Sequence, residues 1–161
     1  MTPSRPPVSR TAATGAAVSI VGDVYRFLAT GEETDGKYST WEAIVPPGGG
    51  PPPHIHRREE ESFIVLEGEV TFWADGRRFT VGPGGFVGLP VGSLHCFKNE
   101  SNQPARMIIS VAPAGLERMF FEVGTPLPSG ATEALPPSPE EIEKLMRIAP
   151  NYGVEIHPPS G

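Results

Sequence analysis

The chain has 161 residues, of which 13 are basic and 19 are acidic, so its formal net charge is −6. This length suits one domain of ordinary size, and without a cluster of lysine and arginine the chain is a poor candidate for binding nucleic acid. No apolar run approaches the length of a membrane span, and the single cysteine excludes an intrachain disulfide. We therefore expect a cytoplasmic protein with neither a nucleic-acid nor a membrane partner.

The first 17 residues are small and polar, include three prolines and show no periodic pattern of apolar residues. They also lack the apolar segment of a signal peptide. We expect residues 1–17 to form a flexible N-terminal arm, or a segment that becomes ordered only against a partner subunit.

Residues 18–125 contain short β-rich runs separated by many of the 19 glycines and 20 prolines of the chain. This spacing is typical of a small many-stranded barrel or sandwich. In the run 37–45, Trp41, Ala43 and Val45 share one face, which we assign to the barrel interior. Strands are expected at 24–29, 37–45, 62–66, 70–73, 78–81, 86–89 and 106–111, with a further strand carrying His95.

The last part of the chain, residues 126–161, is expected to be a linker, a helix and a tail that pack on the barrel. Residues 116–123, just before it, fit either a short helix or a final strand. A capping box at Ser138 with proline at the next position predicts a helix that ends near Ile148. Its expected apolar stripe is Ile142, Leu145, Met146 and Ile148. Residues 151–156 are expected to close with a short strand.

Two short segments contain three of the four histidines of the chain. His54 and His56 are two residues apart, so on an extended strand their side chains point the same way. Glu61 follows after a charged turn, and His95 comes from a strand further along. Three imidazoles and one carboxylate are a ligand set suited to first-row metals, so we predict a metal site formed by these four residues.

Other polar residues near these segments have simpler interpretations. Glu59 and Glu60 belong to a charged run and are expected to be solvated, with Glu60 as a fallback ligand. Cys96 directly follows His95 and should point away from the metal. His157 fits no pattern and is expected to be a surface residue.

The first segment fits the pattern G-x5-H-x-H-x4-E-x6-G from Gly48 to Gly68, and the second fits G-x5-P-x-G-x2-H-x3-N from Gly84 to Asn99. These are the two motifs of the cupin superfamily, which this chain resembles at every motif position. The resemblance implies an all-β fold, a double-stranded β-helix (jelly-roll barrel), here with a short C-terminal helix. It also implies one divalent transition metal per chain (Fe, Mn, Ni, Co, Cu or Zn), bound by the four residues named above.

Segments such as PPHIH, FIVLEGEVTF and PARMIISVAPAGLERMF are similar to the quercetin 2,3-dioxygenase-like group of bacterial cupins. That resemblance implies a dioxygenase that cleaves a flavonol-like or other enolizable small molecule, with Glu61 as the base. Two alternatives remain open: an oxygen-independent metal-dependent isomerase, cyclase or decarboxylase, and a non-catalytic cupin that binds a small molecule. Because cupins are commonly dimers, we also expect a homodimer.

Apolar residues on the expected strands are candidates for the wall of a substrate pocket. The same residues have a second interpretation as barrel core, which is the commoner role for such side chains. The predicted wall residues are Trp41, Phe63, Phe97, Met107 and Ile109, and Phe72, Phe86 and Met119 are further candidates.

Overall fold

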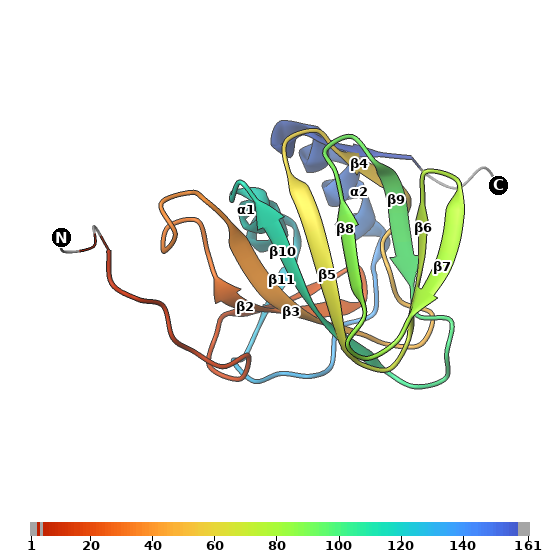
Figure 1. Ribbon diagram of the computed structural model, residues 1–161, viewed down its shortest axis with the longest axis horizontal. Helices are drawn as coiled ribbons and strands as arrows, with labels where there is room; N and C mark the ends of the chain where they lie inside the picture. Colours follow the sequence, from red (N-terminus) through yellow and green to blue (C-terminus); the bar gives the residue numbers. More distant parts are fainter. Residues whose placement is uncertain (1–2, 4, 158–161) are drawn as a thin grey trace.

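Two antiparallel sheets enclose a common interior in the computed structural model, which describes residue 3 and residues 5–157 (Figure 1). In these described residues the larger sheet has seven strands in the order β11 (Thr125–Leu127), β1 (Ala17–Ile20), β2 (Asp23–Ala29), β3 (Ser39–Val45), β10 (Ala105–Ala112), β5 (Glu60–Glu67) and β8 (Phe86–Leu89). The smaller sheet has five, in the order β12 (Val154–Ile156), β4 (His54–His56), β9 (Leu94–Lys98), β6 (Val70–Ala74) and β7 (Arg77–Val81).

The core follows from the alternation of side chains along the strands. On β3, Trp41, Ala43 and Val45 are fully buried, as the sequence pattern predicted. On β5, the inward row is Glu61, Phe63 and Val65. A slip of one residue in the pairing would turn this row outward, so the apolar pattern fixes the register that carries Glu61 to the interior.

Two helices cover one side of the barrel (Figure 1). Residues 116–123, which the sequence left undecided, form helix α1 (Leu116–Val123), whose buried positions follow helical spacing. Helix α2 (Pro139–Ile148) begins as predicted, because Ser138 Oγ accepts a hydrogen bond of 3.1 Å from the backbone N–H of Glu141. Neither described helix is long and apolar enough to cross a membrane.

The predicted apolar stripe of α2 is partly wrong. Leu145 and Ile148 are buried, whereas Ile142 and Met146 are exposed by 45% and 41%. A short 3-10 helix, η1 (Ala149–Tyr152), follows α2 and leads into β12, which confirms the expected closing strand. The buried stripe is narrower than predicted, because of the four residues only Leu145 and Ile148 belong to the hydrophobic core.

Two strands of the larger sheet were not predicted. β1 and β11 lie across the two predicted boundaries of the barrel domain, at 17/18 and 125/126, and they pair with each other at the sheet edge. β1 also pairs with β2. Strands this short have little pattern of their own, because long-range pairing defines them.

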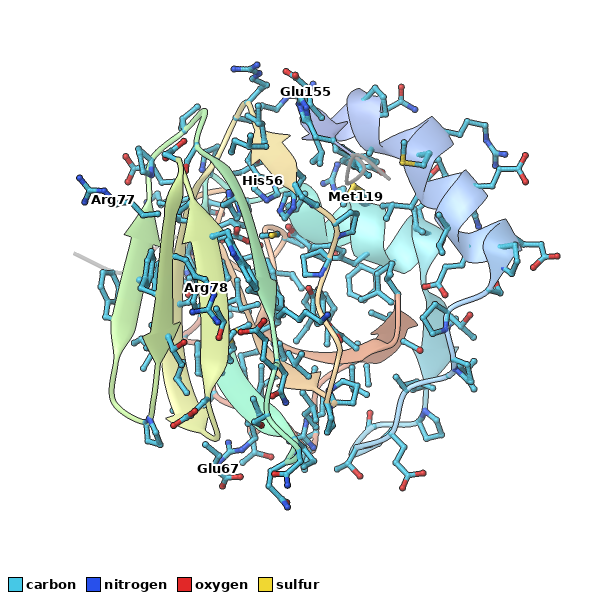
Figure 2. The ribbon with its side chains drawn as sticks, turned by 90° about the vertical axis from the view of Figure 1, so that its right-hand side faces the viewer. His56, Glu67, Arg77, Arg78, Met119 and Glu155 are labelled. Atoms are coloured by element: carbon cyan, nitrogen blue, oxygen red, sulfur yellow. The ribbon has the colours of Figure 1, made fainter. Side chains whose placement is uncertain are left out.

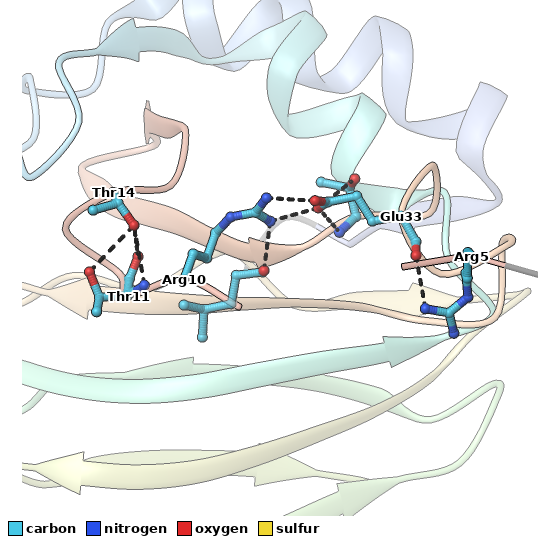
Figure 3. Close-up of polar contacts among 7 residues, drawn as sticks. Arg5, Arg10, Thr11, Thr14 and Glu33 are labelled. Atoms are coloured by element: carbon cyan, nitrogen blue, oxygen red, sulfur yellow. Dashed lines mark hydrogen bonds and ion pairs between the residues drawn. The ribbon is translucent and has the colours of Figure 1, made fainter. Parts of the chain in front are cut away.

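The N-terminal arm contacts the barrel within the same chain, which corrects the expectation of a free arm for its described part (Figure 3). Arg10 donates to the Leu28 carbonyl at 2.8 Å and to both carboxylate oxygens of Glu33 at 2.6 and 2.5 Å. Arg5 donates to the Glu33 backbone carbonyl at 3.0 Å. These described contacts hold the arm along the loop that follows β2 without any partner subunit.

Candidate metal centre

The four predicted ligands converge from three strands. β4 pairs with β9 so that His54 lies opposite His95, while Glu61 comes from β5 of the other sheet. Their ligand atoms all lie within 4.8 Å of one another. In Figure 2, His56 points from β4 into the space where Met119 of α1 also lies.

The glycine-proline loop before β4 sets the position of the first two histidines. At Gly50 the backbone has φ 137°, and an added Cβ would lie 2.0 Å from the carbonyl oxygen of Phe97 on β9. Glycine is therefore required for the loop to pass this close to β9. The close approach places His54 beside His95.

The distances within the cluster match the edges of a metal coordination shell. His54 Nε2 and His56 Nε2 are 3.1 Å apart. Glu61 Oε1 lies 3.0 Å from His95 Nε2 and 3.4 Å from His56 Nε2. Two ligands at right angles, each about 2.1 Å from a shared metal ion, are about 3.0 Å apart. These three distances are compatible with ligation of one ion by the four side chains.

Hydrogen bonds on the far side of two imidazoles fix their tautomers. His54 Nδ1 donates to the Pro52 carbonyl at 2.8 Å, and His95 Nδ1 donates to the Ser93 carbonyl at 3.0 Å. Carbonyl oxygens only accept, so each neutral ring presents an unprotonated Nε2 to the cluster. Unprotonated nitrogens that converge on a carboxylate at these distances form a donor set suited to a shared cation.

The third imidazole faces a carboxylate that sequence reasoning misplaced. Glu59 was expected to be solvated, but it is only 4% exposed. Its Oε2 lies 3.7 Å from His56 Nδ1, and neither atom has a hydrogen-bond partner among the described residues. Burial raises the pKa of Glu59. Glu60 is exposed as expected and stands outside the cluster.

The electrostatics of the cluster favour a neutral His54 and a charged Glu61, whereas the pKa of His56 is raised because Glu61 and Glu59 outweigh the effect of its burial. Burial, together with the charges of His56 and His95, lowers the pKa of His54 to about 3. Burial alone would raise the pKa of Glu61, but the charge of His56 and hydrogen bonds from the histidines outweigh it, and the pKa falls well below its usual range. Near neutral pH, His54 is therefore neutral and Glu61 is charged, which favours Glu61 as a ligand over Glu61 as a base.

A cavity of about 60 Å³ opens beside the cluster. Its wall includes the ligands His54, His56 and Glu61. Side chains from the loop before β4 and from β1, β2, β9, β12, α1 and α2 complete it: Ile20, Val21, Asp23, Tyr25, Pro51, Pro52, Phe97, Met119, Phe120, Leu145, Val154 and Ile156.

Of the five predicted wall residues, Phe97 lines this cavity. The other four, Trp41, Phe63, Met107 and Ile109, are at most 1% exposed and belong to the barrel core. The structure supports the core interpretation for these four residues. The cavity lining includes residues of α1 and α2 instead.

The three further candidates divide in the same way. Met119 lines the cavity, Phe72 is buried in the core, and Phe86 is 66% exposed on β8. Two residues that were not predicted as ligands are placed as expected. Cys96 follows His95 on the opposite face of β9 and is not in the cluster, and His157 is half exposed beside Glu155.

Sequence reasoning missed the polar residues that β2 contributes to the cavity. Asp23 and Tyr25 alternate with Val24 and share a row with the core residue Phe27. Period-two alternation in the segment DVYRF could have revealed them, since it places an aspartate in an otherwise aromatic inward row. The other missed wall residues lie on the helices and on β12, whose positions depend on tertiary packing.

Comparison with known proteins agrees with this geometry. The family model described as "Cupin domain" matches residues 41–111. Quercetin 2,3-dioxygenase of Bacillus subtilis (strain 168) is 30% identical over 108 residues, which are 66% of this chain and 32% of that protein. This chain therefore spans about a third of the length of that curated relative.

Solved structures show the same architecture. The polyketide cyclase RemF from Streptomyces resistomycificus superposes with a TM-score of 0.57 and 27% identity, covering 66% of this chain and 80% of that one. A predicted oxalate decarboxylase from Thermotoga maritima gives a TM-score of 0.61 at 19% identity, covering 66% and 99%. The structure consists mostly of two antiparallel sheets of a cupin fold, with a C-terminal helix. The predicted all-β fold class is therefore confirmed. Residues 41–111, which contain both motifs intact, match the cupin domain, the domain of the cupin superfamily.

Proposed function

We propose that this protein is a metal-dependent cupin enzyme, a dioxygenase that cleaves a flavonol-like or other enolizable small molecule. The observation that carries the proposal is the convergence of imidazole lone pairs and the Glu61 carboxylate beside a largely apolar cavity. The distant likeness to a quercetin 2,3-dioxygenase supports the choice of reaction.

The chemistry follows from the charge of the centre. When bound, a divalent ion with three neutral imidazoles and one carboxylate keeps about one net positive charge and acts as a Lewis acid for an anionic oxygen such as an enolate. The protein orients this site through the Pro52 and Ser93 carbonyls, which hold two of the rings. Phe97, Met119 and Leu145 exclude water from the adjoining cavity, which strengthens the attraction for the enolate.

Replacing Glu61 by Gln separates its two proposed roles. The lowered pKa favours ligation, so we expect the variant to lose metal. A variant that keeps its metal and loses turnover would assign Glu61 the base role instead. Glu60→Gln is the matched control, because Glu60 is the adjacent carboxylate and is exposed.

A second candidate is an oxygen-independent reaction at the same centre, such as a cyclisation. The likeness to the polyketide cyclase RemF at 27% identity favours it specifically. In this case the metal attracts the enolate in the same way, but oxygen takes no part.

Oxygen uptake tests the proposal. The purified chain, loaded in turn with Fe, Mn, Ni, Co, Cu and Zn, is mixed with a panel of flavonols and 1,3-diketones. We expect oxygen consumption matched by loss of substrate with at least one metal. Conversion without oxygen uptake would favour the second candidate, and binding without conversion would indicate a non-catalytic binding protein.

A further inference from the structure

One carboxyl group inside the cavity is not used by the metal centre. Asp23, the first residue of β2, is 2% exposed and lines the cavity with His54, His56 and Glu61. Its Oδ1 has no hydrogen-bond partner among the described residues. Buried polar groups in proteins are nearly always paired, so a group left without a partner in a cavity points to a ligand that supplies one.

The position of this carboxyl group is set by the backbone around it. Val21 and Gly22, with φ of 47° and 86°, form the tight turn between β1 and β2, and Asp23 pairs with Ile20 across it. On the other side, an added Cβ at Gly49 would lie 2.8 Å from Asp23 Oδ1. The fold therefore leaves room for the carboxyl group at this place and holds the strand that carries it.

The charge state of Asp23 decides what it can bind. Burial raises its pKa well above the usual value, which favours the neutral, protonated carboxyl group. A neutral carboxyl group offers one O–H donor and acceptor oxygens, which suits a hydroxyl or carbonyl group and not an ammonium group.

The rest of the cavity sets the size and polarity of the ligand. The wall that Asp23 shares with the metal ligands is mostly apolar and includes Ile20, Phe97 and Phe120. A volume of about 60 Å³ corresponds to about four to six water molecules at 10–15 Å³ each. This space suits a single ring with small substituents better than a fused ring system, so of the substrates in the proposed function it favours a smaller enolizable molecule over a flavonol.

We propose that Asp23 is a substrate-binding residue, and that the substrate is a single-ring enolizable molecule with a second hydroxyl or carbonyl group that hydrogen-bonds to it. This inference rests on the proposed function, because the metal centre binds the other end of the molecule. Its enolizable hydroxyl-ketone pair lies at the metal, its ring lies against the apolar wall, and its second polar group meets the Asp23 carboxyl group.

Two small chelators that differ by one oxygen atom test the proposal. Kojic acid and allomaltol carry the same hydroxyl-ketone pair on the same ring, but kojic acid has a hydroxymethyl group where allomaltol has a methyl group. Calorimetry on the full-length chain loaded with Zn²⁺ measures both affinities without turnover. We expect wild-type protein to prefer kojic acid by about tenfold, the effect of one buried hydrogen bond.

The variants then assign the preference to Asp23. Asp23→Val should abolish it, Asp23→Asn should keep part of it because an amide both donates and accepts, and the surface variant Asp35→Asn should leave it unchanged. Equal binding of the two compounds by wild-type protein would overturn the role of Asp23 while leaving the metal centre intact. Binding of neither compound, with Zn²⁺ bound, would overturn the proposed function and this inference together.

A second readout needs no ligand. If Asp23 is buried without a partner, both variants should melt at a higher temperature than wild-type protein at pH 7, since each removes a carboxyl group that burial disfavours in its charged form. Equal or lower melting temperatures for Asp23→Asn would show that the carboxyl group has a partner in the folded protein, and would overturn the proposal.

Discussion

The metal centre and the opposite wall of the cavity satisfy their polar groups to different degrees. At the metal centre, two of the three histidines donate to nearby backbone carbonyls, and the third faces the carboxylate of Glu59 at 3.7 Å without a hydrogen bond between them. Elsewhere in the cavity wall, Asp23 has an oxygen without a partner. Two imidazoles held in place by the backbone suit a fixed ion, whereas the unpaired oxygen of Asp23 suits an exchangeable ligand.

The two regions also differ in how the chain builds them. β4, β5 and β9 bring the metal ligands together from within residues 54–98. The opposite wall combines β1 and β2 with α1, α2 and β12, from the two ends of the described chain. We infer that changes in one region alter metal affinity and that changes in the other alter ligand choice. The following variants test this division.

The largest effect is expected from His95→Ala. It removes one of four ligands and leaves Glu61 Oε1 without its closest contact in the cluster, so the affinity for Zn²⁺ should fall by more than about 100-fold. Competition with a chelating dye measures the affinity. His157→Ala is the matched control, because it removes the histidine that lies outside the cluster, and its affinity should equal that of wild-type protein. If His95→Ala and His157→Ala bind Zn²⁺ with equal affinity, His95 is not a metal ligand.

A smaller effect is expected from Glu59→Gln. The carboxylate faces His56 Nδ1 at 3.7 Å, and loss of such an outer partner typically lowers metal affinity by about 10–100-fold. The same dye competition measures it, with the exposed neighbour changed in Glu60→Gln as the control. If the two variants bind Zn²⁺ equally well, Glu59 does not orient His56.

Asp23→Asn should leave Zn²⁺ affinity unchanged and alter stability instead. Because the pKa of Asp23 is raised in the folded state, the folded protein binds the proton more tightly than the unfolded chain, and the contribution of Asp23 to wild-type stability falls as pH rises above about 4. The asparagine variant lacks this loss, so its advantage should grow from near zero below pH 4 to about 1–3 kcal/mol at neutral pH. Tyr25 and Glu61 face the same cavity in wild-type protein and in the asparagine variant. Their titration therefore largely cancels in the stability difference between the two proteins. Urea unfolding across this pH range measures it, and an advantage that does not vary with pH would contradict the account.

The metal ligands could be predicted from the sequence because short-range rules determine them. The spacing of His54 and His56 places both on one face of a strand, and the alternation of Glu61, Phe63 and Val65 turns the carboxylate inward. The same alternation puts Glu59 on the side of Glu61, a signal that the surrounding charged run obscured.

The opposite wall could not be predicted, because long-range packing determines it. Leu145 and Val154 reach the cavity only because β12 pairs with β4, about 100 residues earlier in the chain. β1 and β11 are defined by pairing with each other, so alternation can place Asp23 in an inward row but cannot show which elements enclose the cavity that it lines. The prediction of the pocket wall was wrong for four of its five residues for a related reason. Inward side chains on regularly alternating barrel strands usually fill the core and do not line a pocket.

Metal content tests the central claim most directly. The purified full-length chain, dialysed against metal-free buffer and then titrated with Zn²⁺, is analysed by mass spectrometry for bound metals. The account predicts one tightly bound divalent ion per chain, lost when His54, His56, Glu61 or His95 is replaced. A chain that binds no ion, or one whose bound ion survives each of these replacements, would contradict it.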